Sequence, residues 1–175
     1  MAIPNDSIFS VSGPTLVLDL DGTLIRNDLT FELFVLCARW SPIFFLQVAF
    51  KALFDRSTAK RLLAERYALL IDPSALPYDP DVLDLVEACK RGGQSIELVS
   101  GSDEQLVGEI AKHNDIAFFK GSTSQTDLTA SRKAEFLVDR HGSNFLYIGN
   151  SKADASVWQV SQGGMASMLL AGATG

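Results

Sequence analysis

The chain has 175 residues, of which 47% are apolar, so it can bury the core of one domain, or of one domain with a small insert, and is not disordered. Its formal net charge of −6 argues against a nucleic-acid-binding surface, which needs a basic patch. An acidic chain that handles an anionic substrate needs local cations or a metal ion.

The first ten residues, "MAIPNDSIFS", have no basic segment and no apolar core, so they do not form a secretory signal. Cys37 and Cys89 lie far apart and outside any metal or redox motif, which predicts reduced thiols in a cytoplasmic protein. The longest uncharged apolar run, "WSPIFFLQVAF", is too short to span a bilayer, which needs ~20 residues.

Short apolar runs bounded by Gly, Asn, Asp or Ser predict strands at Thr15–Leu20, Ser95–Val99, Ile116–Phe119, Asn144–Ile148 and Met165–Leu170. Helical signals lie between the later runs. They predict helices that begin after Asp79, Ser102 and Ser131 and end at Gly92, His113 and Arg140, and a fourth helix over Asp154–Gln162. Strands that alternate with helices indicate a parallel α/β sheet. His113 and His141 fall at predicted helix ends, where a structural role is expected.

The stretch from Leu29 to Tyr78 breaks this alternation. Helix starts at Ser41-Pro42 and at Ser57 predict a small helical cap over 29–78, inserted after the first strand into a core domain of 1–28 and 79–175. The cap would lie beside the carboxyl end of that strand, where ligands bind in open α/β sheets. Its apolar zone, Phe31–Phe54, indicates either a buried helix pair or a surface that faces lipid or a membrane partner.

Two aspartates, Asp19 and Asp21, come at the end of the first predicted strand, in "LVLDLDGTLIRND". Side chains two positions apart in an extended segment point the same way, so both carboxylates can face one small site. Such a pair suits a bound cation or acid–base chemistry. Glu97 does not fit an apolar central strand, so either it is paired or the strand is shifted.

The sequence resembles the haloacid dehalogenase (HAD) superfamily of phosphatases and phosphotransferases. The resemblance is carried by "DLDGTL" at Asp19–Leu24, by Ser100 at the end of "IELVS", by Lys133 in "SRKAEFL" and by "YIGNSKAD" at Tyr147–Asp154. It implies a HAD-like Rossmannoid parallel sheet of about five strands flanked by helices. A dinucleotide-binding Rossmann domain is disfavoured, because no G-x-G-x-x-G follows the first strand.

The resemblance also implies a role for each motif residue. Asp19 would be the nucleophile, and Asp21 would protonate the leaving oxygen and then activate water. Ser100 and the backbone of Gly101 would hold the phosphate, while Lys133 would offset the charge of nucleophile and phosphoryl group. Mg²⁺ would be held by the Asp19 carboxylate, the Asp21 carbonyl and a side chain of the last motif.

The last motif departs from the family pattern. The usual form is Gly-Asp with a second Asp shortly after, whereas this chain has Gly149-Asn150 and then Asp154. Asn150 keeps an oxygen ligand but loses a negative charge, and Asp154 either orients the loop or replaces that ligand.

A further resemblance is carried by the opening "DLDGTLIRNDL", the apolar helical insert, "DPSALPYDPDVLDLV" and "GNSKADASVW". In this order they resemble the HAD domain fused in front of UbiA-like membrane prenyltransferases, which suggests a prenyl-linked or sugar phosphate and a prenyltransferase partner at the inner face of the membrane. The leading interpretation is a Mg²⁺-dependent phosphatase that acts on a small phosphorylated substrate through an aspartyl-phosphate. The alternative is a weakly active or inactive HAD-fold accessory domain that binds a phosphorylated ligand or a membrane prenyltransferase.

Overall fold

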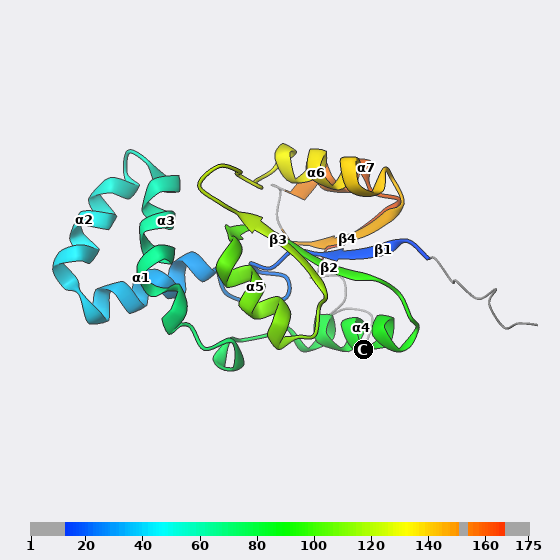
Figure 1. Cartoon of the computed structure of the whole chain (residues 1–175), viewed down its shortest axis with the longest axis horizontal. Coiled ribbons are helices and arrows are strands. Elements are labelled where there is room, and N and C mark those ends of the chain that lie inside the picture. The colour runs from blue at the N-terminus through cyan, green and yellow to red at the C-terminus, as the bar shows by residue number, and fades with distance from the viewer. Residues whose placement is uncertain (1–12, 151–153, 167–175) are drawn as a thin grey trace, which may run out of the picture.

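The computed structural model describes residues 13–150 and 154–166. They form an α/β fold around a five-stranded sheet of order β3-β2-β1-β4-β5, in which all neighbours are parallel (Figure 1). The strands are β1 (Thr15–Leu18), β2 (Ile96–Asp103), β3 (Phe118–Ser122), β4 (Phe145–Gly149) and β5 (Gly163–Ala166). The predicted fold class is confirmed, and the first strand lies at the centre of the sheet.

Several strand boundaries differ from the prediction. β1 ends at Leu18 rather than Leu20, and β3 ends at Ser122 rather than Phe119. β2 continues to Asp103, because after a register shift beyond Val99 its end pairs again with β3. β3 begins at Phe118 rather than Ile116, and β5 begins at Gly163 rather than Met165. The predicted part of the last strand beyond residue 166 lies outside the described residues. Backbone pairing, and not the apolar run alone, sets these ends.

The sheet separates two apolar clusters, and the alternation of β1 explains why. Leu16 and Leu18 point into the larger cluster, while Val17 points into the smaller one. All three are almost fully buried, as expected for a central parallel strand covered on both faces. This burial fixes the position of the residues that follow β1.

Helices cover both faces of the sheet. On one side lie α4 (Pro80–Arg91) and α5 (Glu104–His113), and on the other α6 (Ser131–His141) and α7 (Ala155–Val160) (Figure 1). Asp79 caps α4 as predicted, with Oδ1 accepting from two backbone amides. The predicted caps at Ser102 and Ser131 are wrong. Asp103, and not Ser102, caps α5, and α6 begins at Ser131 without a side-chain cap.

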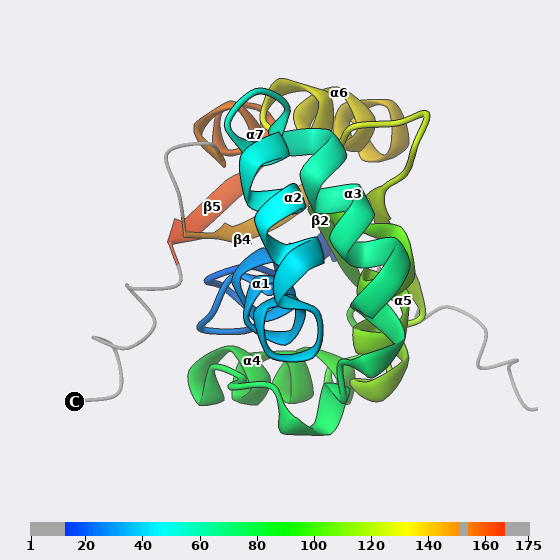
Figure 2. The same ribbon diagram turned by 90° about the vertical axis from the view of Figure 1, so that its left-hand side faces the viewer.

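The predicted helical insert, residues 29–78, contains α1 (Leu29–Trp40), α2 (Pro42–Ala52) and α3 (Arg56–Tyr67), followed by two short 3-10 turns, η1 (Ala68–Leu70) and η2 (Pro73–Ala75) (Figures 1 and 2). The cap of α3 is Asp55 rather than Ser57. α1 and α2 are the expected helix pair, but they are buried on one side only. Within the described residues, no helix is long and apolar enough to cross a membrane.

Glu97 lies inside β2 and is buried, so the predicted strand is not shifted there. Its carboxylate accepts hydrogen bonds of 2.9–3.1 Å from Nε and Nη2 of Arg140 and lies 3.0 Å from Nε2 of His141. The Arg140 guanidinium also lies 3.6 Å from the ring centroid of Phe118. A buried carboxylate is tolerated when it is paired in this way, so Glu97 joins β2 to α6.

Candidate active site

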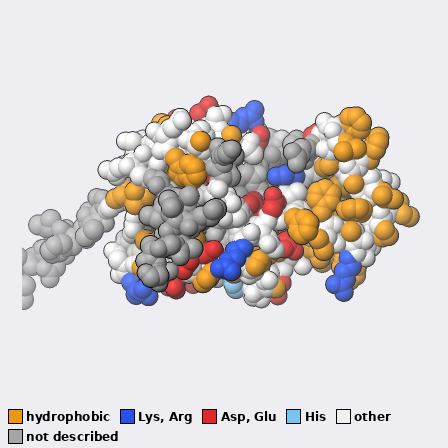
Figure 3. All heavy atoms as spheres, turned by 180° about the vertical axis from the view of Figure 1, so that it is seen from behind, with side chains coloured by type: hydrophobic (Ala, Val, Ile, Leu, Met, Phe, Trp, Pro, Cys, Tyr) orange, Lys and Arg blue, Asp and Glu red, His pale blue; other side chains and the backbone are white. Residues whose placement is uncertain are grey.

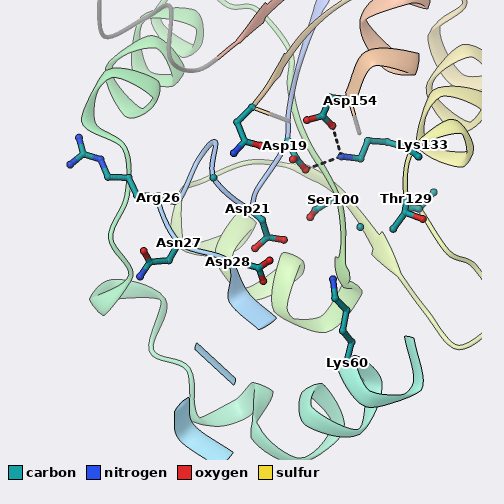
Figure 4. A pocket seen from close by; sticks show the side chains of 15 residues that line it. Asp19, Asp21, Arg26, Asn27, Asp28, Lys60, Ser100, Thr129, Lys133 and Asp154 are labelled. Carbon is teal, nitrogen blue, oxygen red and sulfur yellow. Dashed lines mark hydrogen bonds and ion pairs between the residues drawn. The ribbon is translucent and has the colours of Figure 1, made fainter. Parts of the chain in front are cut away.

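The candidate site lies at the carboxyl ends of β1, β2 and β4, where a pocket of about 470 Å³ opens between the sheet and the insert (Figure 4). The pocket lining includes every residue that the sequence analysis assigned to the site: Asp19, Asp21, Ser100, Gly101, Lys133, Asn150 and Asp154. These residues come from four separate segments of the chain. Parallel strands bring them together because their carboxyl ends meet at one edge of the sheet.

Asp19 directly follows β1, and its amide donates to the carbonyl of Ile148 in β4 at 2.9 Å. Its side chain is buried, and Lys133 Nζ donates to Oδ1 at 2.8 Å. Burial raises the pKa of Asp19 to about 6, although the charge of Lys133 acts in the opposite direction. The pocket therefore holds a carboxylate that lacks full compensation for its charge.

Lys133 is itself buried, and its partners include Asp19 and Asp154 (Figure 4). Besides Asp19, Nζ donates to the hydroxyl of Tyr147 at 2.9 Å and lies 3.4 Å from Oδ1 of Asp154. Tyr147 in turn donates to the same Asp154 oxygen at 2.7 Å. Burial and the two carboxylates raise the pKa of Tyr147 well above its usual value, so it stays a neutral donor. The sequence pattern predicts no role in the site for Tyr147, because a tyrosine inside an apolar strand is typical of a buried core.

Asp21 is held by two donors from other parts of the fold. The amide of Leu29, at the start of α1, donates to Oδ1 at 2.8 Å, and the hydroxyl of Ser102 donates to Oδ2 at 2.5 Å. Burial nevertheless raises the pKa of Asp21 above its usual value. The carboxyl group is thus oriented toward the pocket and is easier to protonate than an exposed aspartate.

Ser100 and Gly101 form the side of the pocket opposite the turn after β1. Ser100 is buried, and its Oγ accepts from the amide of Ser102 at 3.1 Å. A Cβ atom on Gly101 would lie 3.0 Å from Cγ2 of Thr129, so the chain before α6 packs closely on this glycine. Ser102 therefore donates hydrogen bonds to Asp21 through its hydroxyl and to Ser100 through its amide, and it does not cap α5.

The loop after β4 meets the turn after β1 at Gly22. This glycine has φ +69°, and a Cβ atom on it would meet the side-chain amide of Asn150. The positive φ is what excludes other residues at position 22, because an L side chain rarely adopts this backbone conformation. Asn150 lines the same pocket as Asp19, while residues 151–153 of this motif lie outside the described part of the chain.

The insert and the turn before it contribute charged groups that sequence analysis did not assign. Lys60 points from α3 toward the pocket, and Arg26 lies on the opposite wall (Figure 4). The only sequence signal for Lys60 is a basic residue in a helix expected to cover the site. Two cations at the mouth favour an anionic ligand in a chain that is acidic overall.

The described residues contain no group of three or more His, Cys, Asp or Glu placed to hold a metal ion. The pocket does, however, present the oxygen donors that Mg²⁺ prefers, from the Asp19 carboxylate, the Asp21 backbone and the Asn150 amide. Mg²⁺ usually takes only one or two carboxylates and completes its shell with water and substrate phosphate. This donor set therefore fits Mg²⁺ bound together with a phosphorylated ligand.

No protein-family model matches the chain. An uncharacterized protein of Sinorhizobium fredii (strain NBRC 101917 / NGR234), y4nM, is 31% identical over 149 residues, which cover 85% of this chain and 28% of that relative. The chain thus spans little more than a quarter of that relative's length.

Solved structures share the fold at low sequence identity. A HAD family hydrolase of Salmonella enterica subsp. enterica serovar Typhi matches with a TM-score of 0.63 at 14% identity, over 85% of this chain and 61% of that chain. A phosphoserine phosphatase, solved as a phospho-aspartyl intermediate analogue, matches with a TM-score of 0.57 at 16% identity, over 92% and 90%. The chain therefore has the fold of the HAD-superfamily hydrolases.

Proposed function

We propose that the chain is a HAD-type phosphatase that hydrolyses a phosphomonoester through an aspartyl-phosphate on Asp19. The observation that carries this proposal is the buried contact of 2.8 Å between Lys133 Nζ and Asp19 Oδ1 at the bottom of an open pocket. A carboxylate that is desolvated yet held by one cation is well suited to attack a phosphoryl group.

In the first step, a carboxylate oxygen of Asp19 attacks phosphorus and the ester P–O bond breaks. Asp21 gives its proton to the leaving oxygen, a role that fits the raised pKa of this carboxyl group. In the second step, the Asp21 carboxylate takes a proton from water, whose oxygen attacks phosphorus. Phosphate leaves, and the Asp19 carboxylate and the Asp21 proton are both restored.

The other pocket residues would bind and orient the phosphoryl group. Ser100 Oγ and the Gly101 amide would donate to its oxygens, while Lys133 neutralises charge on Asp19. Tyr147 and Asp154 would position Lys133. Mg²⁺, held by the Asp19 carboxylate, the Asp21 carbonyl and Asn150, with Asp154 as a further carboxylate nearby, would supply additional neutralisation of the phosphoryl charge when bound.

The substrate would be a small phosphorylated molecule. We propose that the insert, residues 29–78, acts as a cap on the core of 1–28 and 79–175, because its α3 supplies Lys60 to the pocket wall. The resemblance to HAD domains fused to UbiA-like prenyltransferases suggests a prenyl-linked or sugar phosphate and a membrane prenyltransferase as partner. Both cysteines of the chain are unpaired, which fits a cytoplasmic setting at the inner face of a membrane.

A second candidate is an accessory domain that binds a phosphorylated ligand with little turnover. It is favoured by Asn150, which stands where the resemblance places an acid. The two candidates differ in turnover and not in ligand class.

A phosphate-release screen with and without Mg²⁺ separates them. The panel should contain p-nitrophenyl phosphate, sugar phosphates and prenyl phosphates, with Asp19→Asn as the matched control. Mg²⁺-stimulated release that disappears in Asp19→Asn supports the phosphatase. Saturable binding of a phosphorylated compound without release, equal in wild type and Asp19→Asn, would instead establish the accessory domain.

A further inference from the structure

The insert presents an apolar surface on the side that faces away from the sheet. Figure 3 shows hydrophobic side chains gathered over this end of the molecule. We call this surface the insert patch. Its members are the large exposed apolar side chains of α1, α2 and the turn after α2: Phe31, Val35, Trp40, Ile43, Leu46, Phe50, Leu53 and Phe54.

Helix α2 is apolar on two opposite faces. Val48 is buried, and Phe44 and Phe45 pack against the core cluster, so one face is fully used inside the insert. Ile43, Leu46 and Phe50 recur at helical spacing on the other face and are 66–75% exposed. A helix that is apolar all round is normally covered on all sides, by protein or by lipid. Within the described residues, nothing covers this second face.

The charges beside the outer face of α2 are basic. Glu32, near the start of α1, accepts a hydrogen bond from Asn27. From residue 33 to residue 54 the sequence contains no Asp or Glu, and its two charged residues, Arg39 and Lys51, are both exposed. The bordering Asp55 uses its carboxylate to cap α3 through Thr58. This local excess of cations contrasts with the net charge of −6 of the whole chain. It is complementary to an anionic surface.

Aromatic and basic side chains on one protruding face are the features by which helices bind at a membrane–water interface. Trp40, 68% exposed at the end of α1, has the apolar ring and polar N–H that suit the headgroup region. The three helices form a projecting end of the molecule (Figure 1). A projecting apolar end suits a planar, deformable surface better than it suits a binding groove.

We propose that the insert patch docks on a lipid bilayer that contains anionic phospholipids, with the outer face of α2 in the headgroup region. The interaction is peripheral and goes beyond the proposed catalytic function. Its consequence for the pocket is geometric, because α3, which packs on α2, also carries Lys60. The pocket would therefore lie close to the membrane surface, on the core side of the insert.

The proposal is tested by flotation of the full chain with phosphatidylcholine vesicles and with vesicles of phosphatidylcholine and phosphatidylglycerol. We expect binding to the anionic vesicles and a loss of at least about tenfold in partitioning for Ile43→Ser/Phe50→Ser. The matched control is Val138→Ser, which replaces an exposed apolar residue of α6 and should bind like wild type. Quenching of tryptophan fluorescence by brominated lipid should be lost in Trp40→Phe.

Several results would overturn the proposal. These are absence of binding to either vesicle, equal binding to neutral and anionic vesicles, and binding that survives Ile43→Ser/Phe50→Ser. A dimer in solution that this double variant dissociates, without any vesicle binding of the wild type, would assign the insert patch to a second copy of the chain. None of these readouts requires phosphatase activity, so they are independent of the proposed reaction.

Discussion

Lys133 forms ion pairs with two carboxylates of the pocket, those of Asp19 and Asp154. Its Nζ lies within 4 Å of carboxylate oxygens of both Asp19 and Asp154, and all three side chains are buried. Burial of charged groups is tolerated only when they are paired and hydrogen-bonded. The position of Lys133 therefore depends on the neutral hydroxyl of Tyr147 as well as on the two carboxylates.

Removal of that hydroxyl tests whether Tyr147 positions Lys133. Tyr147→Phe should lower kcat about tenfold, because a hydrogen bond to a charged group contributes ~1.5 kcal/mol, while KM changes less than kcat. Steady-state kinetics on p-nitrophenyl phosphate measure both quantities. Tyr78→Phe, which removes a hydroxyl outside the pocket, is the control and should leave both unchanged. Equal kinetics of Tyr147→Phe and wild type would show that Lys133 does not need this support.

The raised pKa of Asp19 has a consequence for stability. Its value of about 6 in the folded chain lies above the ordinary 3.8, so the protonated form favours folding. This contribution is fully present below about pH 4 and is lost as the pH rises through about 6. Asp19→Asn cannot ionise, so we expect it to gain up to ~3 kcal/mol in free energy of unfolding, relative to wild type, between about pH 4 and pH 7.

Urea unfolding of both proteins in EDTA, at several pH values across this range, measures that difference. EDTA is needed because a bound cation would itself lower the pKa of Asp19. A difference between wild type and Asp19→Asn that stays constant with pH would mean that Asp19 is not desolvated in the folded chain.

At the scale of elements, the positions of most strands along the chain can be predicted from the sequence, but the contacts between elements cannot. Apolar runs and turn residues predict four strands close to their observed positions, and Asp19 and Asp21 are correctly placed at the end of β1. The helix caps at Ser102 and Ser131 were wrong because several nearby polar residues satisfy the same local pattern. Tertiary contacts decide between them, as when Ser102 donates to Asp21 across 81 positions.

The pairing of Glu97 with α6 was equally beyond local patterns, since Arg140 lies 43 positions later. We expect a double-mutant cycle of Glu97→Gln and Arg140→Gln to give a coupling energy of at least ~1 kcal/mol in urea unfolding, because the carboxylate is buried and bound by two guanidinium nitrogens. Arg140→Lys should not restore it, since an ammonium group cannot make the forked contact. If the changes in free energy of unfolding of the two single variants simply add in the double variant, Glu97 and Arg140 do not stabilise each other.

The insert contributes to the pocket through α3. Lys60→Ala should raise KM for p-nitrophenyl phosphate about three- to tenfold with a smaller change in kcat, because Lys60 meets the anion at the mouth and not at the reacting atoms. Arg61→Ala is the matched control, since Arg61 is exposed and pairs with Glu65 instead of lining the pocket. Equal effects of the two substitutions would indicate a general charge effect only.

At the scale of the whole molecule, the candidate site residues lie at one edge of the sheet. Parallel topology brings the ends of β1, β2 and β4 and the start of α6 to the pocket, and the insert reaches the same edge (Figure 2). The residues that follow β1 and the α3 helix of the insert therefore line the same pocket. Proteins with one fold catalyse many different reactions. The proposed reaction must therefore be tested on the carboxylate of Asp19, which would take the phosphoryl group.

The central claim is that Asp19 takes the phosphoryl group, and the most direct test is the mass of a trapped intermediate. Asp21→Asn is incubated briefly with acetyl phosphate and Mg²⁺ and quenched in acid, because acetate leaves without a proton while the missing base slows hydrolysis. We predict one added phosphoryl group on the peptide that contains Asp19, and none in Asp19→Asn/Asp21→Asn. An unmodified Asp21→Asn chain, when wild type releases phosphate under the same conditions, or a phosphoryl group on another residue, would contradict the account.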